Sequence, residues 1–445
     1  MTRYVIVGNS AGCIGAIEAI RQVDPEGPLT VISEEPYPAY SRPQIGRYLA
    51  GEIGLEKSLF RPRAFYAEQR VDLLLGRTAA AIDAERHAVT LDDGRELPWD
   101  KLLLATGGTP IVPSVSGLER IGYHTFMTLE DAQRLRERAP YMRHVLVIGG
   151  GLIGLSATEA LVKLGVQTTI IELAPQILGR ALDGIAAGIV QRLLERHGVR
   201  VLTGCSLAAI EPVAHPADGP AAPLTPFTAT LSNHTALTAD TVIMAIGVRP
   251  RLELAAQAGL SINRGIVVNS HMQTSHPDIY ACGDVAEAYD IIAGGPRLTP
   301  IWPNAYLGGR IAGLNMAGEE RVYGGGTSMN ALHFCGYSLL SAGLVAPEAT
   351  AGHEIITSQP APDIYKKVVL QDGMVLGFIF AGEVDRAGIV YHLLKNRVRV
   401  QGFADKLVAA DLGLLSLPPA LRAELLGTQA FTVAQIPAGV TPHAL

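Results

Sequence analysis

The sequence has few cysteines and no long apolar segment, and both absences narrow its possible functions. Its four cysteines are widely separated, and none forms the C-x-x-C pair of a zinc site or an iron–sulfur cluster. No apolar run reaches the roughly 18 residues that a membrane helix needs. We therefore expect no bound metal and no membrane partner. The cysteines are Cys13, Cys205, Cys282 and Cys335.

Charge is also sparse. Charged residues make up 18% of the 445 positions and the net charge is −6, which argues against nucleic acid as a partner. The chain begins MTRYVIVGNSAG, a strand pattern that leaves no room for a signal peptide, so we expect a cytoplasmic protein. Hydrophobic residues make up 48%, and the 48 glycines are typical of many tight turns between strands and helices. The length allows two or three domains.

The most informative stretch is residues 143–172, RHVLVIGGGLIGLSATEALVKLGVQTTIIE. Its apolar residues predict a buried strand at 145–148, then a helix, then a second strand at 167–171. The glycines after the first strand have the G-x-G-x-x-G spacing of a dinucleotide-binding turn. The first allows a tight turn, the second admits a pyrophosphate, and the third packs helix against strand. They are Gly149, Gly151 and Gly154.

The residues around this turn predict which nucleotide binds. Leu152 and Ile153 begin the helix, whose N-terminus faces the phosphates. Glu172 ends the second strand, about 20 residues after the first glycine, where an acid bonds a ribose 2′-hydroxyl. Because no arginine follows Glu172 closely, a 2′-phosphate would meet only a carboxylate, and the sequence favours NADH over NADPH. The alternative is a strand–helix–strand turn without a ligand.

A degraded copy of the motif lies at the start of the chain. Gly8 holds the first glycine position, while Ser10 and Cys13 hold the second and third. Ser10 is small enough for a phosphate to approach, and Gly12 keeps the turn thin. Strand, helix and strand patterns at 4–7, 14–21 and 29–33 surround it and end at Glu34. We expect a second nucleotide here, which could be FAD; the alternative is a unit that has lost its ligand.

Several further segments indicate nucleotide binding. Arg42 and Arg47 flank Pro43 in a turn, where they could pair with a pyrophosphate or lie beside a flavin, unless they are solvated surface arginines. The segments KLLLATG and TVIMAIGVRP are strands that end in similar turns, and DIYACGD ends in an acid that can bond a polyol chain. Their turn residues are Thr106, Gly107, Gly247, Gly283 and Asp284.

With TPIWPNA at 299–305, these segments resemble the flavin-dependent pyridine nucleotide–disulfide oxidoreductase superfamily over residues 3 to about 320. The similarity is greatest to NADH:rubredoxin and NADH:ferredoxin reductases and to the flavin module of NADH-dependent nitrite reductases. It implies an α/β fold with two Rossmann-like dinucleotide-binding domains plus a C-terminal α+β domain. FAD would bind residues 1–112 and 244–320, NAD would bind the inserted 113–243, and 321–445 would provide dimer or electron-acceptor contacts.

The resemblance also implies roles for single residues. Glu34 would bond the FAD ribose and Asp284 the ribityl chain. Arg42 and Arg47 would lie near the FAD. The residues close to the isoalloxazine would be Trp302, Pro303, Asn304 and Ala305.

Two departures from the family pattern concern catalysis. Relatives that use a redox cysteine carry it just after the second strand, where this chain has Arg42, Pro43 and the two residues that follow, so we expect no cysteine relay. The lysine–glutamate pair that similar enzymes place beside flavin and nicotinamide corresponds to Arg47 and Ser156. Without a partner, a cation there must stay charged or move toward water. Our hypothesis is that Arg47 makes the flavin pocket more electropositive.

The resemblance implies that hydride passes from NADH to FAD, and that single electrons then pass to an iron–sulfur or rubredoxin-like carrier, in a direction that stays open. The alternatives are an NADH oxidase and a structural subunit that retains the fold. A homodimer or a place in a larger redox complex is expected, and a redox role for Cys13 or Cys282 is left open.

The C-terminal part has its own pattern. We expect a flexible junction at 324–326, a hairpin of strands 365–370 and 374–380, and an amphipathic helix at 384–397. The apolar tail, 405–445, would pack on its own domain or dock on a partner.

Overall fold

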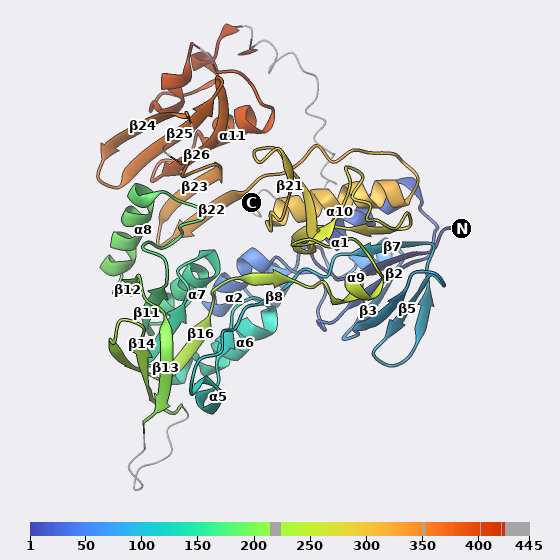
Figure 1. Cartoon of the computed structure of the whole chain (residues 1–445), viewed down its shortest axis with the longest axis horizontal. Coiled ribbons are helices and arrows are strands. Elements are labelled where there is room, and N and C mark those ends of the chain that lie inside the picture. Colours follow the sequence, from blue (N-terminus) through green and yellow to red (C-terminus); the bar gives the residue numbers. More distant parts are fainter. Residues whose placement is uncertain (214–223, 349–351, 401, 420, 423–445) are drawn as a thin grey trace. The chain divides into compact units, whose positions relative to one another are not determined.

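The computed structural model describes residues 1–213, 224–348, 352–400, 402–419 and 421–422 (Figure 1). The chain forms two compact units, Met1–Tyr337 and Ser338–Leu445. Of the helices in the described residues, none is long and apolar enough to span a bilayer. The last part of the predicted apolar tail, from residue 423, lies outside the described residues.

The first unit contains two parallel five-stranded sheets, as expected for two dinucleotide-binding folds. Because both faces of such a sheet are covered, its strands are continuous apolar runs such as YVIV and KLLL. In one sheet the order is β19 (Ile279–Ala281), β7 (Lys101–Leu104), β1 (Tyr4–Val7), β2 (Leu29–Ser33) and β3 (Val71–Leu75). In the other it is β12 (Arg200–Thr203), β11 (Gln167–Glu172), β10 (His144–Ile148), β16 (Thr241–Met244) and β9 (His124–Thr125).

In each sheet the strand that carries the glycine turn lies between the next strand in the sequence and a strand that comes much later. β1 is paired with β2 on one side and β7 on the other, and β10 with β11 and β16. The carboxyl ends of β1 and β10 are therefore the points where the strand order reverses, which is where open α/β sheets bind ligands. We call β1–α1–β2 the first nucleotide unit and β10–α7–β11 the second, with α1 at Ala11–Val23 and α7 at Leu152–Lys163.

Helix α10 (Trp302–Met316) packs against α1, and glycines make this possible (Figure 1). A Cβ atom at Gly309 would overlap the carbonyl oxygen of Gly12, and one at Gly15 would overlap that of Tyr306. The two helices therefore pack backbone against backbone. Helix α1 begins at Ala11, earlier than the predicted 14.

Smaller elements complete the first unit. The sheet β13 (Leu207–Pro212), β14 (Phe227–Leu231) and β15 (Ala236–Ala239) shares a hydrophobic core with β10 and β16. Strands β8 (Gly108–Pro110) and β17 (Val248–Pro250) pair antiparallel where the chain leaves and re-enters the first sheet. The remaining strands are β4 (Ala79–Asp83), β5 (Ala88–Leu91), β6 (Glu96–Pro98), β18 (Ile266–Val267), β20 (Ala286–Asp290), β21 (Gly295–Arg297) and β22 (Met329–Phe334). The remaining helices are α2 (Ile45–Leu49), α3 (Leu55–Ser58), α4 (Phe65–Glu68), α5 (Leu118–Ile121), α6 (Leu129–Arg138), α8 (Gly184–Arg196) and α9 (Glu253–Gln257).

The second unit is an antiparallel sheet with helix α11 (Ala387–Lys395), which agrees with the predicted α+β character. Its neighbouring strands are β23 (Tyr337–Gly343), β26 (Met374–Ala381), β25 (Ile364–Gln371) and β24 (Glu354–Ala361). The predicted hairpin is confirmed: Asp372 and Gly373 form its turn with φ of 51° and 70°, as a two-residue type I′ turn requires. The helix begins at Ala387, three residues later than the predicted 384.

Gly326, in the predicted flexible junction at 324–326, makes specific contacts. The Gly326 amide donates to the carbonyl of Tyr289 (3.1 Å), and its own carbonyl accepts from Ile291 (2.9 Å). A Cβ atom at Gly326 would lie only 2.6 Å from Oδ1 of Asn304, so the glycine is needed for packing rather than for mobility. The division between the compact units comes after Tyr337, beyond the boundary expected at 321.

Candidate cofactor and active site

The first glycines of the two nucleotide units have nearly the same conformation. Gly8 has φ of 109° and Gly149 has φ of 111°, backbone angles that residues with a Cβ atom rarely adopt. A Cβ atom at Gly8 would overlap the carbonyl oxygen of Ala105, and one at Gly149 would overlap that of Ala245. Although the first motif is degraded in sequence, its turn has kept the geometry of the second.

The helices that follow these turns begin without a side-chain cap. Within the described residues, neither Ser10 at the start of α1 nor Gly151 at the start of α7 accepts a capping hydrogen bond from its helix. By contrast, Thr128 and Asp183 cap α6 and α8. The first amides of α1 and α7 are thus available to an anion, and a dinucleotide pyrophosphate fits them.

The third positions of the two motifs differ. Gly154 is needed in α7, because a Cβ atom there would overlap the carbonyl oxygen of Gly149. Cys13 is fully buried in α1, and the close approach falls on Gly12 instead. A Cβ atom at Gly12 would lie 2.6 Å from Sγ of Cys282 and 3.3 Å from the carbonyl oxygen of Ala305. The first turn is therefore built against the CGD segment and the start of α10.

The two ribose acids are held in different ways. Glu172 accepts from the Gly150 amide at Oε2 (2.7 Å) and from the Ala174 amide at Oε1 (2.8 Å), which leaves lone pairs for ribose hydroxyls. Glu34 is 56% exposed and forms an ion pair with Nη1 of Arg251. The first is thus oriented by nearby backbone, and the second by a side chain.

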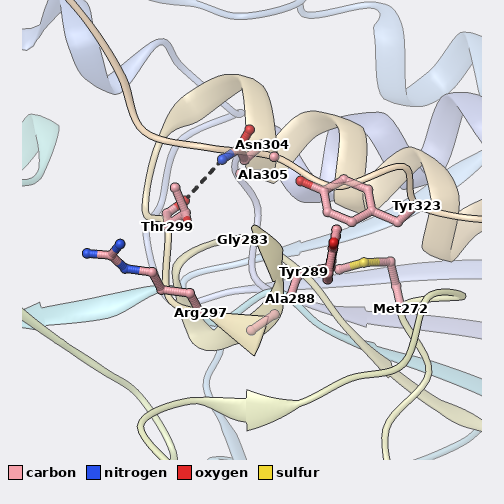
Figure 2. A pocket seen from close by; sticks show the side chains of 11 residues that line it. Met272, Gly283, Ala288, Tyr289, Arg297, Thr299, Asn304, Ala305 and Tyr323 are labelled. Atoms are coloured by element: carbon pink, nitrogen blue, oxygen red, sulfur yellow. Dashed lines mark hydrogen bonds between the residues drawn. The ribbon is translucent and has the colours of Figure 1, made fainter. Parts of the chain in front are cut away.

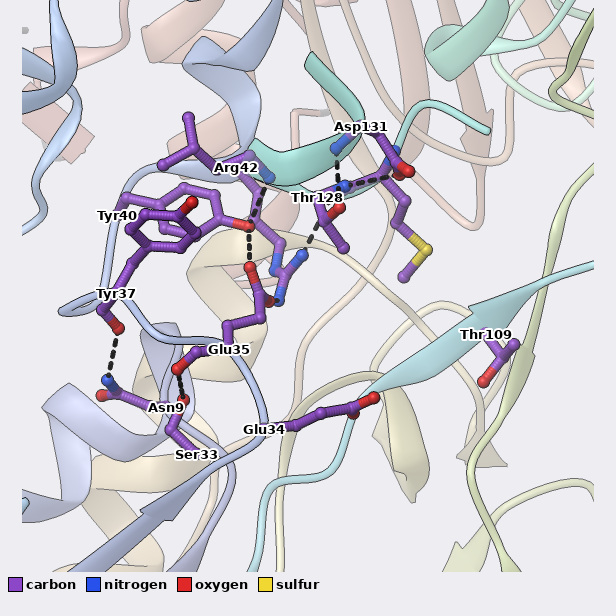
Figure 3. Close-up of polar contacts among 12 residues, drawn as sticks. Asn9, Ser33, Glu34, Glu35, Tyr37, Tyr40, Arg42, Thr109, Thr128 and Asp131 are labelled. Atoms are coloured by element: carbon purple, nitrogen blue, oxygen red, sulfur yellow. Dashed lines mark hydrogen bonds and ion pairs between the residues drawn. The ribbon is translucent and has the colours of Figure 1, made fainter. Parts of the chain in front are cut away.

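Arg42 is fixed in a polar network rather than free in solvent (Figure 3). Its Nη2 donates to Oε1 of Glu35 (2.5 Å), and its Nη1 donates to the carbonyl of Met127 (2.9 Å). Tyr40 donates to the other oxygen of Glu35 (2.6 Å) and accepts from the Leu129 amide (2.9 Å). The turn after β2 is therefore fastened to the start of α6, and Pro43 next to Arg42 is exposed at its edge.

Asp284 is a half-buried carboxylate without a hydrogen-bond donor among the described residues. Burial raises its pKa, and the nearby positive charge of Arg42 opposes that shift. A carboxylate in this setting lacks the donors that usually compensate for lost water. Polyol hydroxyls would supply them, so Asp284 fits the ribityl chain of a flavin nucleotide.

Several of the predicted flavin contacts line one pocket (Figure 2). Asn304 donates to the carbonyls of Thr299 (3.5 Å) and Thr327 (3.3 Å), which fixes its amide at the start of α10. Trp302 meets Phe60 edge to face at 5.0 Å, and Pro303 occupies the first turn of the helix. The pocket is lined by Gly283, Tyr289, Arg297, Thr299, Asn304 and Ala305, among others.

Strands β8 and β17 and the turns beside them connect the two sheets, and we call them the crossover. The crossover carries the other predicted turn residues. Thr106 donates through Oγ1 to the carbonyl of Arg251 (3.2 Å), and Gly107 accepts from the Arg251 amide (3.0 Å). Gly107 and Gly247 have φ of 67° and 138°, so both turns need glycine.

Arg47 and Ser156 are not bonded to each other in the described part of the chain. Arg47 is 56% exposed and donates from Nε to Oε2 of Glu52 (3.2 Å), whose other oxygen accepts from Lys163 (2.6 Å). Ser156 faces Gly46, where a Cβ atom would lie 2.6 Å from the serine Oγ. The arginine thus lies toward water, and its proposed effect on a flavin stays a prediction.

The thiols have little tendency to ionise. Cys13, Cys205 and Cys282 are buried, and Cys335 is partly exposed. Burial, with a smaller effect of Asp284, raises the pKa of Cys282 to about 12, and burial also raises the pKa of Cys13. Since the thiolate is the reactive form, these thiols are poorly suited to redox exchange at neutral pH. Across the described residues, no cluster of three or more histidine, cysteine or acidic side chains could hold a metal.

Sequence reasoning missed three charged residues of this region: Glu35, Glu52 and Arg251. Glu35 directly follows the predicted acid Glu34, and this position next to Glu34 was the signal in the sequence that could have identified it. Arg251 directly follows the AIGVRP segment, but its partner Glu34 is 217 residues away. No local spacing could have predicted that pair.

Comparisons with known proteins show which families this chain resembles. Residues 2–309 match the family model of the pyridine nucleotide-disulphide oxidoreductases, and residues 329–398 match that of the rubredoxin NAD+ reductase C-terminal domain. The chain is 31% identical over 418 residues to the NADH-dependent phenylglyoxylate dehydrogenase subunit epsilon of Aromatoleum evansii, covering 93% of this chain and 96% of that subunit. It is 32% identical over 291 residues to the rubredoxin-NAD(+) reductase of Pseudomonas putida, covering 65% and 73% of the two chains.

Longer relatives and solved structures extend the comparison. The nitrite reductase [NAD(P)H] of Bacillus subtilis is 30% identical over 401 residues, which cover 89% of this chain but 48% of that protein, so this chain spans about half of its length. Putidaredoxin reductase, in its covalent complex with putidaredoxin, superposes with a TM-score of 0.80 at 27% identity, over 89% of this chain and 94% of that one.

Proposed function

Because the chain belongs to the pyridine nucleotide-disulphide oxidoreductase family, we propose that it is an FAD-dependent oxidoreductase that moves electrons between NADH and an iron–sulfur or rubredoxin-like protein. The match of residues 329–398 to the C-terminal domain of rubredoxin NAD+ reductases is the observation that carries the choice of carrier. The family and its solved members use FAD and NAD(H) as cofactors, and the two nucleotide units provide a place for each.

In this proposal FAD binds the first nucleotide unit. Its pyrophosphate lies at the free amides of α1 and its adenosine ribose at Glu34. Asp284 accepts from the ribityl hydroxyls, and Arg42 balances the negative charge beside it. The start of α10 lies against the flavin ring. The full set of proposed contacts is Gly8, Ser10, Gly12, Cys13, Glu34, Arg42, Pro43, Arg47, Thr106, Gly107, Gly247, Gly283, Asp284, Trp302, Pro303, Asn304 and Ala305.

NADH binds the second nucleotide unit, with its pyrophosphate at the amides of α7 and a ribose at Glu172. The proposed contacts are Gly149, Gly151, Leu152, Ile153, Gly154 and Glu172, and Ser156 lies one turn further along α7. The corresponding division is an FAD domain of residues 1–112 and 244–320, an NAD domain of 113–243, and a C-terminal domain of 321–445 for dimer or acceptor contacts.

When bound, FAD would supply the chemistry, since it accepts a hydride and releases electrons one at a time. The protein's task is to hold the two nucleotides in register and to keep water from the reacting rings. The buried, protonated thiols of Cys13 and Cys282 offer no relay. This absence of a thiol relay favours a carrier that takes single electrons directly, and one relative of this chain is a rubredoxin-NAD(+) reductase.

An anaerobic absorption spectrum before and after stoichiometric NADH tests the core of the proposal. We expect flavin bands that NADH bleaches and NADPH bleaches much less. Reoxidation by rubredoxin or by a small iron–sulfur ferredoxin, followed in the same cuvette, tests the carrier. A protein without flavin would contradict the proposal, and rapid oxygen-dependent oxidation of NADH without a carrier would replace it with an oxidase.

A second candidate is the nucleotide-binding subunit of a larger redox complex, in which electrons enter from a protein donor and reduce NAD+. The observation in its favour is the relative from Aromatoleum evansii. That relative is itself a subunit, and this chain covers 96% of its length. Flavin that stays oxidised with NADH, but is reduced by dithionite-reduced ferredoxin and then reduces NAD+, would favour this direction. Equal rates of NADH oxidation and of NAD+ reduction would mean that the enzyme works reversibly.

A further inference from the structure

The first nucleotide unit holds its acid by an ion pair from a distant part of the chain. Glu34 follows β2, and its Oε2 is paired with Nη1 of Arg251, 217 residues later. The Glu34 and Arg251 side chains are 56% and 38% exposed, so the pair lies at a rim that a ligand can reach. In the described chain only Oε2 of Glu34 is engaged, which leaves Oε1 free to accept from a hydroxyl.

Arg251 is itself firmly placed. Its amide donates to the carbonyl of Gly107 (3.0 Å), its carbonyl accepts from Oγ1 of Thr106 (3.2 Å), and its Nε donates to Oγ1 of Thr109 (3.0 Å). These three bonds fasten the arginine to the segment that leaves the first sheet. In Figure 3 the Glu34 side chain extends toward the strand that carries Thr109. The guanidinium therefore meets Glu34 at a position set by the Arg251 backbone and by the Thr109 side chain.

We propose that Arg251 is a positioning residue for FAD, which orients Glu34 so that its free oxygen accepts from the adenosine ribose. The inference rests on the placement of the FAD adenosine at Glu34 in the proposed function. The pairing of Arg251 with Glu34 also has an electrostatic effect on FAD binding. A carboxylate beside the FAD diphosphate would repel it, and the paired guanidinium neutralises that carboxylate without occupying both of its oxygens.

This arrangement gives Arg251 a specific effect on one half of the cofactor. Glu34 and Arg251 would act on the adenosine half, which FMN lacks, whereas Asp284 and α10 would act on the flavin half. A residue that acts through Glu34 should therefore change the affinity for FAD and leave the affinity for FMN unchanged. A residue that merely stabilises the crossover should weaken both.

The test uses apoprotein of the full chain, titrated with FAD and with FMN while flavin fluorescence is followed. We expect Arg251→Gln and Glu34→Gln each to raise the dissociation constant for FAD about tenfold, as for loss of one charge-assisted hydrogen bond. The double variant should be no weaker than Glu34→Gln alone, because Arg251 acts through that carboxylate. Arg251→Lys should recover part of the loss, and FMN binding should not change.

Arg249 provides the matched control. It lies on β17, two residues before Arg251, is exposed, and makes no ion pair within the described residues. Arg249→Gln should bind FAD as the wild type does. An equal loss in Arg249→Gln and Arg251→Gln would reduce the effect to general surface charge and overturn the inference.

The remaining outcomes separate this inference from the proposed function. If Glu34→Gln weakens FAD binding and Arg251→Gln does not, the ribose placement stands and the role of Arg251 is overturned. If Arg251→Gln weakens FMN as much as FAD, the residue supports the crossover only, and the inference is again overturned. If neither variant changes FAD affinity, the placement of the adenosine at Glu34 is wrong as well.

Discussion

The two nucleotide units have the same turn but obtain its supporting contacts from different places. In the second unit, the helix packing of Gly154 and the anchoring of Glu172 come from the unit's own backbone or from Ala174 just beyond it. In the first unit, Gly12 packs against segments near 282 and 305, and Glu34 is held by Arg251. A unit that supplies its own contacts must keep its sequence motif, whereas one supported from outside can lose two glycines and retain the turn.

The largest effects are expected at the first glycines, where the comparison predicts two distinct losses. Gly8→Ala and Gly149→Ala each place a methyl group on a backbone carbonyl at φ near 110°, a cost on the order of 2–3 kcal/mol. Gly8→Ala should purify without flavin. Gly149→Ala should keep its flavin absorbance but no longer be bleached by NADH.

Gly165→Ala is the control for these variants, because it has φ of 75° with open space around it and so adds strain without overlap. It should keep both flavin and bleaching. The opposite pattern, with flavin lost in Gly149→Ala and kept in Gly8→Ala, would mean that the two nucleotides are assigned to the wrong units.

A second prediction concerns Glu172, the acid of the second nucleotide unit. Glu172→Gln removes the charge that would repel a 2′-phosphate while keeping the side chain's size and one of the two oxygens that accept from the Gly150 and Ala174 amides. We expect the preference for NADH over NADPH, measured as the ratio of kcat/KM, to fall about tenfold, or about 1.4 kcal/mol. FAD affinity should not change, and a parallel loss of FAD would contradict the separation of the two units.

The third prediction follows from the raised pKa of Asp284. A carboxyl group whose folded-state pKa is raised contributes stability that is present below its ordinary pKa and is lost as the pH rises through the raised value. Asp284→Asn should therefore make the apoprotein more stable than the wild type at pH 8, with the difference shrinking toward pH 4. Melting temperatures of the two apoproteins across this range would show it.

The same substitution should weaken FAD binding, because the amide loses a charge-assisted acceptor for the ribityl hydroxyls. Apoprotein of Asp284→Asn that is less stable than the wild type at pH 8 would mean that the carboxylate is stabilised by its surroundings, against the direction of its pKa shift.

The smallest effect is expected at Arg47. Since this arginine is half exposed and paired with Glu52, its pair should contribute at most about 1 kcal/mol and be screened by salt. We expect Arg47→Gln to leave the flavin midpoint potential nearly unchanged, whereas Arg42→Gln, close to Asp284, should lower it. A clear fall in the potential of Arg47→Gln would support the hypothesis from the sequence that its charge lies in the flavin pocket.

Local patterns predicted the features that depend on local backbone. The strand Leu29–Ser33 has the predicted limits, the glycine turns lie at the predicted strand ends, and Asp372 with Gly373 forms the predicted hairpin turn. Each of these follows from hydrophobic periodicity or from a required positive φ.

Contacts between distant segments were not predictable in this way. Residues 324–326 were expected to be flexible because glycine runs usually are, yet Gly326 packs against Asn304. The start of α1 was placed too late because its glycines disfavour helix, a preference that packing against α10 overrides. The partners of Arg47 and Glu34 also required the fold.

The glycine contact between α1 and α10 has a consequence for how the protein is made. The first sheet takes its edge strand from Ile279–Ala281, and α1 receives its cover only from Trp302–Met316. The five strands of the second sheet all lie between His124 and Met244. On the ribosome, the second sheet can therefore form while the earlier-made N-terminal strands still lack their last strand and covering helix. If FAD binds the first nucleotide unit as proposed, its site is complete only after α10 has been synthesised.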